Sequence, residues 1–351
     1  MSSVTDLPAG STALKAQGKS GFSLKPSRLW GFLLAVAVGV AAMGLGKLWP
    51  LIGGPVFAIV LGMVLRNSMG VAPVFQPGLR FSSKVLLQWS IIGLGFGLSL
   101  PQVMRTGMDS LAVTLVTLTV AFVTALVLGR VLGIPSKLRT LIGVGTAICG
   151  GSAIAAVTPI LKPEEHETAL AISTIFIFNI VAVLIFPLAG HMMNMSDAGF
   201  GVWAGTAIND TSSVVAAGYS YSRQAGDHAT IVKLTRATLI IPICLILAGL
   251  EMWRSRQAGR DFDLMRVFPW FIVWFMVASA LRSLGWVPVE WLEPLRFLAE
   301  FLMVLALAAI GLCSDLKVMA RAGARPALLG LGVWIAVALS SLLVQRWIGV
   351  W

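Results

Sequence analysis

A twelve-residue motif occurs twice in this chain, and it limits the possible folds more than any other feature. The first copy begins at Gly145 and reads GTAICGGSAIAA, and the second begins at Gly205 and reads GTAINDTSSVVA. Pairing the copies without a gap, at an offset of 60 residues, gives six identical positions out of twelve. Both copies place glycines and polar side chains inside hydrophobic stretches, where lipid cannot satisfy them. Such segments are tolerated at membrane depth only where protein buries them or where they line a water-filled cavity.

The composition is that of a polytopic membrane protein. Of the 351 residues, 57% are hydrophobic and 12% are charged, and the mean hydropathy is +0.89, values far from those of a soluble domain. The formal net charge of +11 arises from basic residues that cluster between apolar runs. The charge therefore indicates membrane topology and not a nucleic-acid partner.

The basic loops predict the topology. Residues 1–29 are polar and basic and are expected to form a disordered cytoplasmic tail, so that 30–351 form one transmembrane domain. The first motif follows the basic loop 130–139, whereas the loop at 191–198 contains neither Lys nor Arg. If these two loops lie on opposite sides of the membrane, the unit between them crosses it an odd number of times.

Each repeat unit, 139–190 and 199–250, contains a motif followed by one helix-length apolar run. That run supplies one full crossing, so the motif segment should enter and leave on one side as a re-entrant hairpin. We therefore predict an all-α protein with about nine transmembrane helices and two hairpins, which form an inverted repeat, and with a cytoplasmic N-terminus. The alternative is eleven crossings, with complete broken helices and parallel repeats.

The polar residues of the motifs are candidates for a binding site. Asp210 is the one acidic residue in either motif, and carboxylates at membrane depth often mark ion pathways. It is expected either to couple an ion or to cap the N-terminus of a half-helix. Its neighbours offer hydroxyl and amide groups that suit an oxyanion, or that serve only to satisfy a hairpin tip. The motif candidates are Thr146, Cys149, Gly150, Gly151, Ser152, Thr206, Asn209, Asp210, Thr211, Ser212 and Ser213.

Lys233 and Arg236 are two further candidates, because they share one face of the apolar run 229–250. Two interpretations remain open at this stage. They attract an anionic substrate, or they reach out to the membrane interface as a snorkelling pair. Asn179, in the middle of another apolar run, is expected to form an interhelical hydrogen bond.

The sequence offers little for catalysis. The histidines, His166, His191 and His228, fall in loops or at the ends of apolar runs, and HExxH, Walker and nucleophile-elbow motifs are absent. Ser152 could act as an intramembrane nucleophile only if a base activated it, and no histidine is placed at the same membrane depth. We therefore expect no catalytic residue, no metal site and no cofactor.

Several long segments together resemble the YeiH-like sulfate exporter family of bacterial inner-membrane proteins. They are PGLRFSSK at 77–84, GTAICGGSAIAAV at 145–157, EEHETALAI at 164–172, GTAINDTSSVVAAG at 205–218, VKLTRATLIIP at 232–242 and AAIGLCSDLK at 308–317. The resemblance implies a place beside the cation/proton antiporter and anion transporter superfamily, with inverted repeats, homodimers and elevator-like movement. It places the substrate at 149–152 and 209–213. Asn209 departs from related sequences, which often have His before the Asp, so a proton-relay role at position 209 is in doubt.

These observations favour a secondary transporter that exports a small sulfur oxyanion across a bacterial inner membrane. The leading candidates for that anion are sulfate and sulfite. The expected partners are that anion, the lipid bilayer, a second copy of the chain and a coupling H⁺ or Na⁺. Two alternatives stay open. One is a cation/proton antiporter that uses Asp210, and the other is a membrane sensor or assembly protein that transports nothing.

Overall fold

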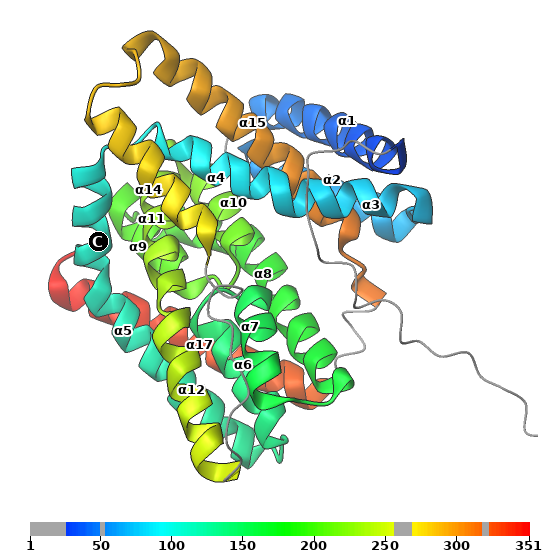
Figure 1. Ribbon diagram of the computed structural model, residues 1–351, viewed down its shortest axis with the longest axis vertical. Coiled ribbons are helices and arrows are strands. Elements are labelled where there is room, and N and C mark those ends of the chain that lie inside the picture. Colours follow the sequence, from blue (N-terminus) through cyan, green and yellow to red (C-terminus); the bar gives the residue numbers. More distant parts are fainter. Residues whose placement is uncertain (1–25, 50–52, 256–268, 318–322) are drawn as a thin grey trace, which may run out of the picture.

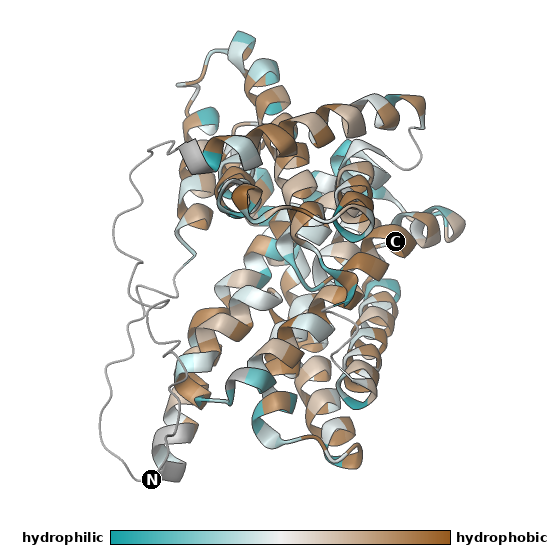
Figure 2. Ribbon diagram, turned by 90° about the vertical axis from the view of Figure 1, so that its right-hand side faces the viewer, coloured by the Kyte–Doolittle hydropathy of each residue, from teal (hydrophilic) through white to brown (hydrophobic). Residues whose placement is uncertain are grey.

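The computed structural model describes residues 26–49, 53–255, 269–317 and 323–351, and every regular element within these ranges is helical (Figure 1). The first helix begins at Pro26, so residues 26–29 belong to it, and the rest of the predicted tail lies outside the described residues. Hydrophobic residues cover much of the long helices, with hydrophilic residues mostly near helix ends and turns (Figure 2). That distribution suits helices that face lipid.

The helices form two bundles (Figure 1). The first, called here the α15 bundle, contains α1 (Pro26–Leu48), α2 (Gly53–Ser68), a 3₁₀ turn (Pro73–Phe75), α3 (Gln76–Phe81), a π-helical turn (Ser82–Leu86), α4 (Leu87–Gly95), α14 (Trp270–Ser283) and α15 (Val289–Cys313). The second, the hairpin bundle, contains α5 (Leu100–Val131), α6 (Ser136–Ala147), α7 (Gly151–Leu161), α8 (Glu165–Met192), α9 (Asp197–Ala207), α10 (Thr211–Tyr221), α11 (Arg223–Thr238), α12 (Ile240–Ser255) and α17 (Ala324–Ile348).

The number of candidate crossings agrees with the predicted fold class. Within the described residues, six helical spans are long and apolar enough to cross a bilayer, with α11 and α12 counted as one. Three shorter apolar helices are α2, α7 and α14, of which α7 belongs to the first motif segment. With α2, α14 and the continuous helical stretch Gln76–Gly95 added, the candidates for a full crossing are 6 + 2 + 1 = 9. At about 1.5 Å per residue, the 20 residues of that stretch extend about 30 Å, the thickness of the hydrocarbon core.

Both motif segments fold as hairpins whose two ends are tied together. At the base of the first, the Nζ atom of Lys137 donates to the carbonyl oxygen of Lys162 at 2.8 Å. At the base of the second, the hydroxyl of Ser222 donates to Asp197 and the hydroxyl of Tyr221 donates to the carbonyl oxygen of Met195, each at 2.5 Å. Each segment therefore enters and leaves at the same end, as a complete broken helix could not.

Helix α8 sets the relation between the two hairpins. Three residues separate the end of the first hairpin from the start of α8, and four separate the end of α8 from the start of the second hairpin. Halfway along α8, the Oδ1 atom of Asn179 accepts a hydrogen bond from the backbone N–H of Asp210 in the second hairpin, at 3.2 Å. The hairpins therefore approach from opposite ends of α8, and their tips meet near its middle. In Figure 1, α9 and α10 accordingly lie above α6 and α7.

The two bundles are joined by an apolar contact and by an ionic network. Val215 and Ala216 of α10 are buried in a cluster with residues of α1, α2 and α15. Beside it, the Nη2 atom of Arg296 on α15 donates to Asp227 on α11 at 2.7 Å. Asp227 also accepts from the hydroxyl of Tyr219 at 2.6 Å. Among the described residues, the ion pairs between the bundles all lie at the end where the second hairpin has its base.

Thiol labelling in cells would test the placement of the hairpins in a membrane. Ser136 begins α6, Asn194 lies between α8 and α9, and both are exposed. In a background without the native cysteines, Ser136→Cys should be protected from an impermeant thiol reagent added outside, whereas Asn194→Cys should react. Reaction of both from one side would contradict the opposed hairpins and return the topology to eleven crossings.

Candidate functional site

The two hairpin tips differ in how their second helix begins. In the first tip, Gly150 has φ +68° and ψ −131°, and it precedes α7 without any side-chain cap. In the second tip, Asp210 is the N-cap of α10, and its carboxylate accepts from the backbone N–H of Ser212 at 3.0 Å and from the Ser212 hydroxyl. A helix N-terminus with free N–H groups is a natural anion-binding site. The uncapped start of α7 therefore offers such donors, and the start of α10 is already occupied by a carboxylate.

Lys233 and Arg236 bind backbone carbonyl groups at the C-terminal ends of the helices that lead into the tips. The Nζ atom of Lys233 donates to the carbonyl oxygens of Ile148, at 2.7 Å, and Ile208, at 2.9 Å, which end α6 and α9. One ammonium group thus ties the two hairpins together. Arg236 donates from Nε to Ala147 O at 2.5 Å and from Nη2 to Thr146 O at 2.9 Å. Cations at helix C-termini satisfy the free carbonyl groups and balance the helix dipole.

The snorkelling interpretation of this pair is wrong. Lys233 and Arg236 are each 0% exposed, and both donate to backbone carbonyl groups of the hairpins instead of reaching outward. Sequence reasoning put them on one helical face, which is correct. It could not show that the opposing surface would be the backbone carbonyl groups at the ends of α6 and α9.

Unpaired polar atoms gather around the tips. Four buried side-chain atoms there have no hydrogen-bond partner among the described residues, namely Thr146 Oγ1, Asn179 Nδ2, Asn209 Oδ1 and Arg236 Nη1. Buried polar groups are normally satisfied, so each exception calls for an explanation. Two of these atoms are N–H donors, and a hydroxyl can also donate, so water or a bound anion would satisfy them.

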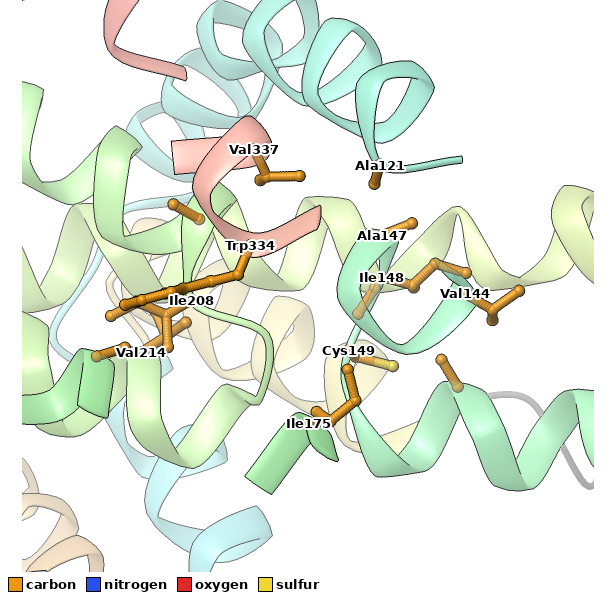
Figure 3. Packing of buried hydrophobic residues seen from close by; sticks show 14 of the residues in the cluster. Ala121, Val144, Ala147, Ile148, Cys149, Ile175, Ile208, Val214, Trp334 and Val337 are labelled. Carbon is orange, nitrogen blue, oxygen red and sulfur yellow. The ribbon is translucent and has the colours of Figure 1, made fainter. Parts of the chain in front are cut away.

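Hydrophobic residues surround the tips. Ile148 and Cys149 of the first tip lie near Ile175 of α8, and Ile208 and Val214 of the second lie beside Trp334 of α17 (Figure 3). In the first tip the exceptions are Ser152, which is exposed, and Gly151, which is partly exposed, and in the second the exception is Asp210, which is partly exposed. Access to the site is therefore along the Ser152 and Asp210 side of the tips.

The structure places the sequence candidates in three groups. Those at the breaks and the first turns that follow them are Cys149, Gly150, Gly151, Ser152, Asn209, Asp210, Thr211, Ser212 and Ser213. Thr146, Lys233 and Arg236 lie on the carbonyl side. Thr206 stands apart, because its hydroxyl contacts the Ser341 hydroxyl of α17 at 2.7 Å, one turn before the break. Asn179, expected to be an interhelical hydrogen bonder, is one.

Sequence reasoning missed the contribution of α17. Ser341 and Gln345 are fully buried, and the Nε2 atom of Gln345 donates to the Ser341 hydroxyl at 2.9 Å. Gln345 therefore fixes the Ser341 hydroxyl, which in turn contacts the hydroxyl of Thr206. Their signal in the sequence is the spacing of four between Ser341 and Gln345 within a mostly apolar run, which places both on one helix face.

Comparison with known proteins places the chain in a family. A family model described as "Conserved hypothetical protein 698" matches residues 30–330. The chain is also 44% identical over 330 residues to the UPF0324 membrane protein spr0034 of Streptococcus pneumoniae, covering 91% of this chain and 97% of that protein. The chain belongs to the UPF0324 membrane-protein family. A further relative is the UPF0324 membrane protein FN0533 of Fusobacterium nucleatum, 39% identical over 344 residues, with 92% and 99% of the two chains covered.

Among solved structures, the sodium proton antiporter MjNhaP1 from Methanocaldococcus jannaschii aligns over 92% of this chain and 97% of its own. The sequence identity is 14% and the TM-score is 0.29. At that score the likeness carries no conclusion about fold or function. The chain is thus a multi-pass membrane protein of the UPF0324 family.

Proposed function

We propose that this protein is a secondary transporter of a small sulfur oxyanion, with sulfate and sulfite as the first candidates. The observation that carries the proposal is the group of three buried atoms that can donate a hydrogen bond and have no partner, Thr146 Oγ1, Asn179 Nδ2 and Arg236 Nη1, at the meeting point of the hairpins. An oxyanion accepts several hydrogen bonds at once and carries the charge that Lys233 and Arg236 attract. It would bind at the start of α7, where no side chain caps the first backbone N–H groups.

The arrangement of the helices supports alternating access. Opposed hairpins that meet at mid-depth, with half-helix ends facing one another, are the usual site in transporters built from inverted repeats. The hairpin bundle would move relative to the α15 bundle in an elevator-like step, and the Arg296 network would have to separate during that step. We propose further that the protein works as a homodimer in a bacterial inner membrane, with its N-terminus in the cytoplasm.

The membrane potential is sufficient to drive export. It contributes about 2.3 kcal/mol per elementary charge per 100 mV, and it favours the exit of an anion from a cell that is negative inside. The chain carries no nucleotide-binding motif. An ion gradient or the potential would therefore supply the energy, and a coupling H⁺ or Na⁺ is not required thermodynamically.

A cation/proton antiporter is the second candidate, and one observation favours it. The carboxylate of Asp210 is partly exposed, and among the described residues it forms no ion pair. Such a carboxylate can exchange a proton for a metal cation. The third candidate, a membrane sensor or assembly protein, would show no flux of either kind.

Flux measurements with the purified full chain in liposomes distinguish the three candidates. Radiolabelled sulfate and sulfite, with thiosulfate and a small organosulfonate as competitors, should enter loaded vesicles faster than empty-liposome controls. Exchange of Na⁺ for H⁺ without any anion flux would favour the antiporter. The absence of both fluxes, in vesicles where the protein is shown to be folded and inserted, would favour the sensor.

A further inference from the structure

The formal charges at the hairpin tips do not balance, and this limits what the site can carry. Lys233 and Arg236 contribute two positive charges and Asp210 one negative charge, a sum of 2 − 1 = +1. Among the described residues, the other elements that pack around the tips add no charge there. Helix α8 contributes Asn179, α10 has no charged residue, and the charged residue of α9, Asp197, lies at the hairpin base. Cys149 is the remaining titratable group at the tips.

The half-helix dipoles cancel one another. The C-terminal ends of α6 and α9 each place about half a negative charge at the tips, and the N-terminal ends of α7 and α10 each place about half a positive charge there. Their sum is close to zero. The excess of one positive charge therefore belongs to the side chains, and backbone dipoles do not offset it.

An unbalanced charge is costly in a buried site, because the surroundings have a low dielectric constant. We infer that the site carries a dianion together with one proton, and that the proton resides on Asp210. With Asp210 protonated the side chains sum to +2, which a dianion such as sulfate neutralises. With Asp210 ionised the sum is +1, which only a monoanion neutralises.

The position of Asp210 supports this linkage. A Cβ atom added to Gly150, the residue before α7, would lie 3.4 Å from the Cβ atom of Asp210. A dianion at the start of α7 would therefore sit beside this carboxylate. Two neighbouring anions repel each other, and a proton carried on this carboxylate removes that repulsion while the dianion is bound. The proton comes from solution and returns there when the dianion leaves, so each cycle moves one net negative charge.

This inference rests on the proposed function, and calorimetry of sulfate binding tests the two separately. Titration of the full chain with sulfate, in buffers of different ionisation enthalpy, gives the number of protons taken up. We expect one proton per sulfate for the wild type and none for Asp210→Asn. The Asn variant should bind sulfate with an affinity that no longer falls as pH rises. Asp109→Asn, which changes an exposed carboxylate on α5, is the matched control and should behave as wild type.

The outcomes are distinct. Sulfate binding by the wild type without proton uptake, or flux that moves two charges per sulfate and ignores an imposed pH gradient, would overturn the inference and leave the proposed function standing. The absence of sulfate binding and flux would overturn both. The wild-type measurement decides between these outcomes even if Asp210→Asn fails to fold.

Discussion

Lys233→Met should abolish transport and lower the stability of the protein strongly. Methionine has a similar length, so it fills the same volume but donates no hydrogen bond. The carbonyl oxygens of Ile148 and Ile208 would then be buried without a partner, since a single ammonium serves both. Each buried acceptor left unsatisfied costs about 1–3 kcal/mol, so we expect the free energy of unfolding to fall by about 2 kcal/mol or more.

Thermal unfolding in detergent, measured beside sulfate flux, checks this result. Lys137→Met is a well-matched control, because its Nζ atom also donates to a carbonyl oxygen, that of Lys162, but at an exposed position. There water replaces the lost donor, and the effect should be within a few tenths of a kcal/mol. Equal effects of the two substitutions would show that the bridge between the hairpin tips contributes nothing special.

Sequence reasoning could predict the hairpins because two independent signals agreed. The repeated motif marked the irregular segments, and the contrast between loop 130–139 and loop 191–198 required an odd number of crossings per unit. The first signal follows from the inability of lipid to satisfy polar groups, and the second from the preference of arginine and lysine for the cytoplasmic side. The structure adds the hydrogen bonds that close each hairpin at its base.

The role of Lys233 could not be predicted in the same way. Its apolar neighbours and its spacing from Arg236 suit both a lipid interface and a buried site, because helical periodicity gives the face and not the depth. Whether Lys233 is buried depends on contacts between residues far apart in the sequence. Lys233 and Ile148, for example, are separated by 85 residues. The network around Arg296 escaped prediction for the same reason, since Asp227 lies 69 residues away.

Gly150→Ala should disrupt the site more than the addition of a single methyl group suggests. The backbone at this residue has φ +68° and ψ −131°, a region that residues with a side chain rarely occupy. Holding alanine there costs about 1–3 kcal/mol. The cheaper response is for the tip to change its backbone, which would displace the first N–H groups of α7. We therefore expect sulfate affinity to fall at least tenfold, a loss that isothermal titration would measure.

Gly151→Ala, one residue later, provides the control. Gly151 is the first residue of α7, its φ is not positive, and an added Cβ atom would meet only Phe176 Cε2, at 3.7 Å. Alanine is favoured over glycine in a helix by roughly 0.5–1 kcal/mol, so this variant should be as stable as the wild type or slightly more so. Its backbone N–H groups stay in place, and sulfate binding should persist. If both variants bound sulfate like the wild type, the anion would not be held by the start of α7, and Lys233 and Arg236 would have to attract it elsewhere at the tips.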